Sequence, residues 1–142
     1  MKKRILLVDD EVSFTRLLKL NLEQLNAYEV RIVNWAEDAL EVARQFRPQI
    51  VLLDVIMPRL VGGDVAEQLR SDEILKNTPI LFFTAAVSKC RVQQHEGFIS
   101  GFPFLAKPAT IEEIINEIER LVPDEPTLPF EVAESETGKA CP

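Results

Sequence analysis

The sequence has few cysteines, no long apolar run near its N-terminus and fewer basic than acidic residues. Its only two cysteines, Cys90 and Cys141, have no metal-ligand spacing, so neither a disulfide framework nor a zinc site is indicated. The apolar run near the N-terminus covers only residues 5–8, too short for a signal peptide or a membrane span. The 16 bases are outnumbered by 23 acids, and the resulting net charge of −7 argues against a nucleic-acid-binding surface. We therefore expect a cytoplasmic chain with no membrane contact and no direct DNA binding.

What is present is the composition of an ordinary globular protein, with 46% hydrophobic and 27% charged residues in a chain of 142. One composition change divides the chain. Residues 123–142 hold five acids, one base and four of the nine prolines. This acidic, proline-rich stretch is predicted to be a disordered tail, and residues 1–122 are predicted to form a single domain.

Residues 1–122 alternate between strand-like and helix-like segments. The strand-like segments are 4–8, 28–33, 49–54, 79–84 and 101–106, and the helix-like segments are 13–26, 36–46, 63–71, 88–96 and 110–121. Ser13 is a candidate helix cap, and Thr110 stands in capping-box register with Glu113.

This alternation predicts an α/β fold, a doubly wound five-stranded parallel sheet with helices on both faces. Proline cannot donate a hydrogen bond to a sheet, so the strand that contains Pro103 is expected at an edge. The strand order 2-1-3-4-5, known from flavodoxin-like proteins, places the fifth strand there.

Polar residues follow the apolar strands at the edge where ligand sites form in such sheets. Asp9 and Asp10 follow the first strand, Asp54 ends the third, Thr84 ends the fourth and Lys107 follows the fifth. Three close carboxylates repel one another unless they are protonated or bind a cation, and Mg²⁺ suits a site with few carboxylates. Lys107 and Thr84 would then suit a phosphoryl group, with Asp54 as a carboxylate nucleophile.

Each of these residues alone has a simpler explanation. Asp9 or Asp10 could cap the following helix, Thr84 could be an ordinary strand-end threonine, and Lys107 a surface lysine. It is the presence of all of them at matching strand ends that indicates a site.

The same segments strongly resemble the receiver domain of two-component response regulators. The resemblance covers roughly residues 3–122 and is carried by four stretches, LLVDDE (6–11), VLLDVIMP (51–58) followed by Gly62, PILFFTA (79–85) and FLAKP (104–108). It implies a phosphorylation-dependent signalling switch rather than an enzyme.

The resemblance also implies roles for the acids. Asp54 resembles the phosphoacceptor, phosphorylated by a histidine kinase or a phosphotransfer protein. Asp10 and Asp54 resemble direct Mg²⁺ ligands, together with the backbone carbonyl of Ile56, and Asp9 resembles a ligand that acts through water. Mn²⁺ is expected to substitute for Mg²⁺.

Three further roles follow from the resemblance. Lys107 resembles the residue that pairs with the phosphoryl group, Thr84 the switch residue that moves towards it, and Phe104 the aromatic that rotates inward. The signal is then expected to change a surface formed by the fourth helix, the fifth strand and the fifth helix. The effector that binds this surface is expected to be a protein, which the sequence does not identify.

Two departures from the family pattern carry expectations. Acidic residues that often precede the strand-5 aromatic are missing from residues 100–103, which disfavours charge-based dimerisation. Phe102 lies within this stretch and Phe98 just before it, so we expect an apolar surface for a partner or for a homodimer. Ile56 and Ala86 are apolar where the family often has polar residues near the attacking water, so we expect slow loss of the phosphoryl group.

Two alternative functions are considered. An aspartyl-phosphate phosphatase of the haloacid dehalogenase type would need a second acid two residues after Asp54, where this chain has Ile56. A phosphorylation-independent pseudo-receiver typically lacks one of the acids or the lysine, and this chain has all of them.

The chain leaves no room after residue 122 for a DNA-binding helix-turn-helix, so output is expected through protein contacts or through a part beyond this sequence.

Overall fold

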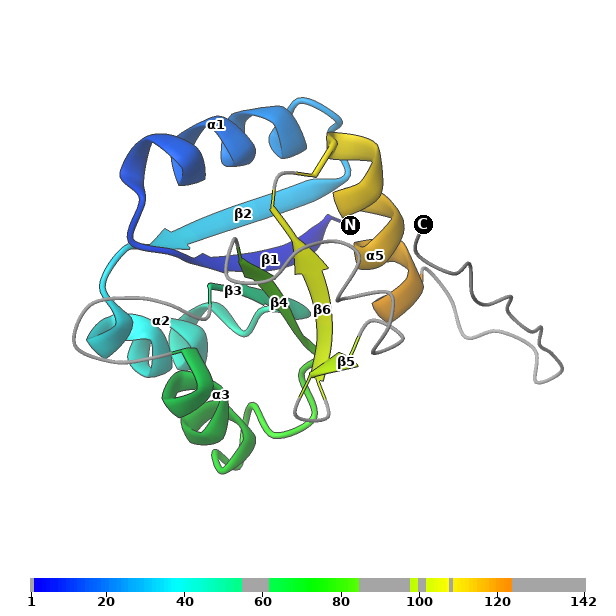
Figure 1. Ribbon diagram of the computed structural model, residues 1–142. Coiled ribbons are helices and arrows are strands. Elements are labelled where there is room, and N and C mark those ends of the chain that lie inside the picture. The colour runs from blue at the N-terminus through cyan, green and yellow to red at the C-terminus, as the bar shows by residue number, and fades with distance from the viewer. Residues whose placement is uncertain (1, 55–61, 85–97, 100–101, 108, 124–142) are drawn as a thin grey trace, which may run out of the picture.

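A parallel β-sheet forms the centre of the protein. The computed structural model describes residues 2–54, 62–84, 98–99, 102–107 and 109–123. The parallel strands are β1 (Lys3–Val8), β2 (Tyr28–Val33), β3 (Ile50–Leu53), β4 (Ile80–Thr84) and β6 (Phe102–Ala106), in the order β2-β1-β3-β4-β6. Because β6 is the fifth parallel strand along the chain, this is the predicted 2-1-3-4-5 arrangement (Figure 1).

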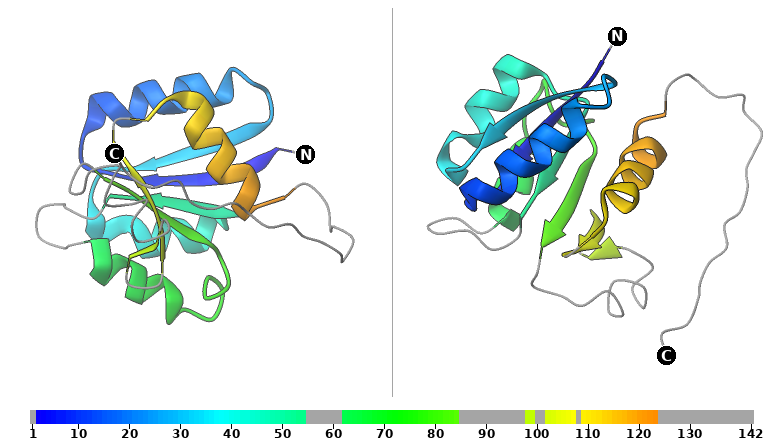
Figure 2. Two further views of the ribbon diagram at one scale, coloured as in Figure 1. Left: turned by 45° about the vertical axis from the view of Figure 1, so that its right-hand side comes forward. Right: turned by 90° about the horizontal axis from the view of Figure 1, so that it is seen from above.

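Helices cover both faces of this sheet. They are α1 (Val12–Glu23), the 3-10 turn η1 (Ala36–Asp38), α2 (Ala39–Phe46), α3 (Gly62–Arg70) and α5 (Ile111–Leu121). Figure 2 shows α1 and α5 on one face and α2 and α3 on the other. Within the described part of the chain, no helix is long and apolar enough to cross a membrane.

The two faces of the sheet have separate apolar cores. Alternate residues of β1 and β3 point to opposite faces, so Leu7 and Leu52 pack with α1 and α5, while Leu6 and Leu53 pack with α2 and α3. All four side chains are at most 1% exposed. Burial on both faces explains why these strands are continuous apolar runs in the sequence.

The sheet edge differs from the prediction in one respect. A short strand β5 (Phe98–Ile99) pairs antiparallel with β6 beyond the parallel edge, opposite Pro103 and Phe102. The strand with Pro103 is thus the outermost parallel strand, as expected, but β5 covers part of its outer side. The predicted helix 88–96 lies outside the described residues.

Two helix starts test the expected caps. The capping box of α5 is confirmed, because Thr110 Oγ1 accepts from the Glu113 backbone N–H at 3.1 Å and Glu113 Oε1 accepts from the Thr110 N–H at 2.9 Å. The prediction for Ser13 is wrong. α1 begins one residue earlier, with Glu11 at the N-cap position, so Ser13 lies inside the first helical turn.

Two helical segments also differ from the sequence prediction. α1 ends at Glu23 rather than at Asn26, which has a φ of 60° that cannot continue a right-handed helix. The segment 36–46 divides into η1 and α2, with the Asp38 N–H donating to the Trp35 carbonyl in a 3-10 bond of 3.0 Å.

The end of α5 is tied to the start of β1. Lys3 Nζ lies 2.5 Å from Glu119 Oε1 and donates to the Val122 backbone carbonyl at 2.5 Å. The Tyr28 hydroxyl donates to Glu119 Oε2 at 2.5 Å. This network joins β1, β2 and α5 where the last helix ends.

A buried carboxylate joins α2 to the loop after α3. Asp72 is 6% exposed, and its Oδ2 lies 2.5 Å from Arg44 Nε, while its Oδ1 accepts from the Ile74 backbone N–H at 2.8 Å. The hydrogen bond from the Ile74 N–H first, and then Arg44, hold the pKa of Asp72 below that of an ordinary aspartate, and burial opposes them only in part. The charged form of the Asp72 carboxyl group therefore stabilises the folded state.

We expect the Asp72→Asn substitution to destabilise the protein most at neutral pH. A carboxyl group with a lowered pKa in the folded state contributes stability above its unfolded pKa, and this contribution is lost as the pH falls through the folded value. The difference in unfolding free energy between wild type and variant should therefore shrink below about pH 4. Denaturant unfolding across this range measures it. Glu73→Gln is the control, because Glu73 has a side chain that is 91% exposed. A pH-independent difference would contradict the prediction.

Candidate functional site

The first and third strands bring two acids together at the carboxyl edge of the sheet. Val8 and Leu53, the last residues of β1 and β3, are register partners. The Asp54 N–H donates to the Val8 carbonyl at 2.9 Å, and the Asp9 N–H donates to the Val33 carbonyl at 3.0 Å. Backbone pairing thus extends one residue beyond the strands and fixes the positions from which both carboxylates project.

Three carboxylates form a cluster here. Asp9, Asp10 and Asp54 each offer an oxygen, and these oxygens lie within 4.8 Å of one another. Asp9 is 3% and Asp54 9% exposed, whereas Asp10 is exposed. Oxygen ligands at this spacing, one of them open to solvent, fit a hard divalent cation that keeps part of its water shell. The donor set therefore suits Mg²⁺ or Mn²⁺.

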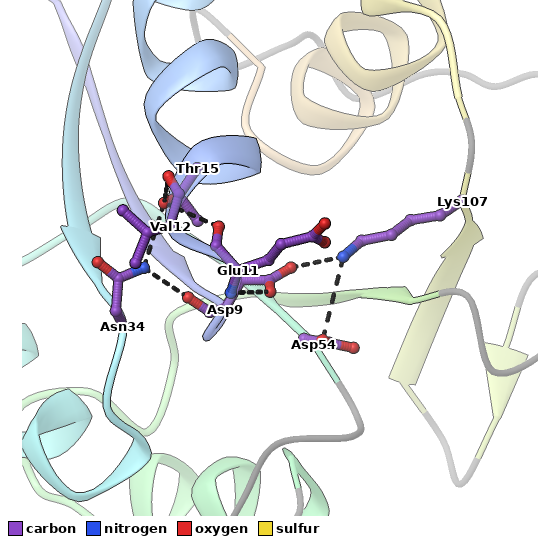
Figure 3. A network of polar contacts seen from close by, with 7 residues as sticks. All are labelled: Asp9, Glu11, Val12, Thr15, Asn34, Asp54 and Lys107. Carbon is purple, nitrogen blue, oxygen red and sulfur yellow. Dashed lines mark hydrogen bonds and ion pairs between the residues drawn. The ribbon is translucent and has the colours of Figure 1, made fainter.

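Lys107 is the positive charge of the cluster. Its Nζ lies 2.5 Å from Asp9 Oδ2 and 4.0 Å from Asp54 Oδ2, and its side chain is 14% exposed (Figure 3). The residue follows β6, which pairs with β4 so that Thr84 lies opposite Ala106. The fifth parallel strand thus delivers the lysine to the acids, as the sequence predicted.

Asp9 is held in place by its neighbours. Its Oδ1 accepts from the Glu11 N–H at 3.0 Å, and its backbone carbonyl accepts from Asn34 Nδ2 at 2.7 Å. Asn34 also donates to Thr15 Oγ1 at 3.2 Å, which links the end of β2 to the first turn of α1 (Figure 3). Asp9 is therefore fixed by backbone and side-chain contacts on both sides.

The remaining predicted site residues are only partly described. Thr84 ends β4 at the same edge of the sheet, in register with Ala106. Phe104 is 5% exposed, with its ring centroid 5.4 Å from that of Phe82, so it occupies an inward position. Ile56 and Ala86 lie outside the described residues. The switch roles of Thr84 and Phe104 stay predictions.

Two contributors to this site were not predicted from the sequence. Asn34 directly follows the second strand, the same relation to a strand end that identified the acids. Phe14, in α1, has its ring centroid 4.3 Å from Lys107 Nζ. An aromatic residue one helical turn after an acid pair was the available signal.

Comparison with known proteins identifies the family. The model of the response regulator receiver domain matches residues 5–119. The chain belongs to this family. The chain is 38% identical over 133 residues to the response regulator MprA of Mycobacterium leprae (strain TN), and the match covers 93% of this chain and 55% of that protein. It is also 42% identical over 85 residues to the alkaline phosphatase synthesis transcriptional regulatory protein PhoP of Bacillus subtilis (strain 168), covering 60% of this chain and 34% of PhoP.

Solved structures agree with the fold of a receiver domain. The chemotaxis protein CheY4 of Vibrio cholerae aligns with a TM-score of 0.72 at 27% identity, covering 85% of this chain and 99% of that one. The receiver domain of the sensor histidine kinase PA1611 of Pseudomonas aeruginosa PAO1, with a magnesium ion in its active site cleft, gives a TM-score of 0.71 at 26% identity, covering 86% and 98%. The chain spans about half or less of the two regulators above but nearly the whole of these two structures. The receiver family is a family of signalling domains.

Proposed function

We propose that this receiver domain is a phosphorylation-dependent switch in which Asp54 accepts a phosphoryl group. The observation that carries the proposal is the arrangement of charges at the sheet edge. Three acids have oxygens within 4.8 Å of one another, and Lys107 Nζ lies 4.0 Å from Asp54 Oδ2. A strand-end carboxylate beside a cation site and an ammonium group has what phosphoryl transfer requires, which is positioning and charge neutralisation.

In the proposed reaction, a carboxylate oxygen of Asp54 attacks the phosphorus of a phosphohistidine on a kinase or phosphotransfer protein. An oxygen–phosphorus bond forms as the nitrogen–phosphorus bond breaks, which leaves an acyl phosphate on Asp54 and a free imidazole on the donor. Lys107 neutralises one phosphoryl oxygen, and Thr84 supplies a hydroxyl donor. Mg²⁺ or Mn²⁺, held by Asp10, Asp54 and the Ile56 carbonyl with Asp9 through water, would neutralise and orient the phosphoryl oxygens.

The output is proposed to pass through protein contacts rather than through DNA. Phosphorylation would move Thr84 and Phe104 and so change the surface of β6, α5 and the segment 88–96 that the sequence predicts as a helix, where an effector or a second copy would bind. Sedimentation with and without a phosphodonor distinguishes an effector from a second copy.

The net charge of −7 supports the absence of a DNA-binding surface, and we place this activity in the cytoplasm. Residues 1–122 would form the receiver and residues 123–142 a disordered tail.

The deciding experiment compares wild type with Asp54→Ala. Wild-type protein incubated with Mg²⁺ and acetyl phosphate should gain one phosphoryl group by intact-mass spectrometry, and it should bind beryllofluoride when Mg²⁺ is present. Asp54→Ala should do neither. Asp64→Ala, which removes an exposed acid of α3, is the control and should behave as wild type. Phosphorylation of Asp54→Ala would reject Asp54 as the acceptor. No phosphorylation of the wild type would reject the proposal and favour a pseudo-receiver.

We also expect the phosphorylated protein to lose its phosphoryl group slowly. Ile56 and Ala86 offer no side-chain group that could orient or deprotonate an attacking water. The double substitution Ile56→Asn with Ala86→Glu should therefore shorten the phosphoryl half-life at least about tenfold, because general acid–base assistance is typically worth more than this. The decay of phosphorylated protein after removal of the donor measures it. An unchanged half-life would contradict the expectation.

A further inference from the structure

The ammonium group of Lys107 lies against two phenylalanine rings. Its Nζ is 4.3 Å from the ring centroid of Phe14 and 5.6 Å from that of Phe83. The two rings are 5.6 Å apart at 55°, so α1 and β4 contribute to one surface. A cation within about 6 Å of a ring centroid is attracted to the ring, and the shorter distance makes Phe14 the stronger partner.

The position of Lys107 also depends on Asp9. The Asp9 carboxylate is its nearest charged partner at 2.5 Å, whereas Asp54 is at 4.0 Å. Asp9 is also one of the three acids that suit a divalent cation. A cation among these acids would weaken the attraction between Asp9 and Lys107 and repel the ammonium group. Unless another group holds it, the lysine would then move into water, away from Asp54.

We propose that Phe14 is a positioning residue for phosphoryl transfer, with a ring that holds the Lys107 ammonium beside Asp54 while Asp9 is engaged by the metal. The ring carries no formal charge, so its attraction persists when the carboxylates are neutralised. This inference rests on the proposed function and adds to it a residue of α1 that touches no phosphoryl oxygen. Phe14 is half-buried, so a residue of similar bulk can replace it without opening the main core.

The first test needs no ligand. In the protein without metal, the Hε protons of Lys107 should show upfield NMR shifts caused by the Phe14 ring. Phe14→Leu should remove most of this shift, and Phe14→Tyr, which retains an aromatic face, should preserve it. Lys107 shifts that are the same in wild type and Phe14→Leu would overturn the proposed contact.

The second test separates metal binding from anion binding. In saturating Mg²⁺, Phe14→Leu should bind beryllofluoride about three- to tenfold more weakly than wild type, and Phe14→Tyr should restore the affinity. The affinity for Mg²⁺ alone should change less than about twofold, because the ring contacts the lysine and not the acids. Phe46→Leu is the matched control. It removes the Arg31–Phe46 cation–π contact of 4.6 Å at the end of α2, on the other face of the sheet from Phe14, and should leave both affinities unchanged.

A double-substitution cycle completes the test. If Phe14 acts through Lys107, then Phe14→Leu should cause no further loss of beryllofluoride affinity in the Lys107→Met background. An equal loss in both backgrounds, or no loss in the wild-type background, would overturn the inference. Failure of wild type itself to bind beryllofluoride would instead reject the proposed function, and the NMR comparison would still decide whether Phe14 positions Lys107.

Discussion

Lys107→Met is expected to lower the affinity for beryllofluoride in Mg²⁺ about 30- to 100-fold. The Lys107 side chain is 14% exposed and its Nζ lies 4.0 Å from Asp54 Oδ2, where the anion would bind. Truncating one partner of a buried charged pair costs about 2 kcal/mol or more in binding, and each 1.4 kcal/mol is about tenfold. Methionine keeps most of the length and bulk of the lysine, so the change isolates the charge.

The same substitution should act in the opposite direction on the metal. Lys107 Nζ lies 2.5 Å from Asp9 Oδ2 and competes with any cation for that carboxylate. Lys107→Met should therefore bind Mg²⁺ about three- to tenfold more tightly by calorimetry. Without Mg²⁺ the variant should unfold more readily, and Mg²⁺ should stabilise it more than wild type by ligand linkage.

Lys19→Met is the control for these measurements. Lys19 forms a surface ion pair with Glu23 at 4.0 Å and is 40% exposed, so its replacement should change neither affinity. Weaker Mg²⁺ binding by Lys107→Met, or unchanged beryllofluoride binding, would contradict the assigned role of the lysine.

The second large effect is expected on stability. Leu53→Ala should lower the free energy of unfolding by about 3 kcal/mol, within the usual range of about 2–5 kcal/mol for a buried leucine. Leu53 is fully buried, pairs in register with Val8 and Phe82, and directly precedes Asp54. A cavity there removes contacts on the face covered by α2 and α3.

Denaturant unfolding measures this loss as a lower midpoint at an unchanged slope. Leu17→Ala is the control, because Leu17 on α1 is 59% exposed and its truncation should cost less than about 0.5 kcal/mol. A loss below about 1 kcal/mol for Leu53→Ala would mean that β3 is not the packed support that its burial indicates.

The parallel order of the sheet could be predicted because its signals are local. Uninterrupted apolar strands require cover on both faces, and a polar residue at each strand end marks the edge where ligands bind. Strand β5 could not be predicted in the same way. Phe98 and Ile99 make a strand of only two residues, too short to show a period, and its pairing with β6 is a tertiary contact.

The acids and the lysine of the site could likewise be predicted, but not how they pair. Lys107 and Asp9 are 98 residues apart, and three acids compete for one ammonium group. Strand ends indicate that these residues meet, whereas side-chain distances decide which carboxylate is nearest. The contact with Phe14 depends in addition on how α1 packs over the sheet. For the same reason the expected cap at Ser13 failed, because contacts of Asp9 and Glu11 at the end of β1 set where the helix begins.

The contact between Lys3 and Val122 has a consequence for how this unit can be joined to other proteins. The first strand begins where the last helix ends, because Lys3 Nζ touches both Glu119 and the Val122 carbonyl. The two ends of the folded unit thus lie near each other on the same side of the protein. A host protein could carry it as an insertion in a single loop, since the two attachment points lie within the reach of one lysine side chain.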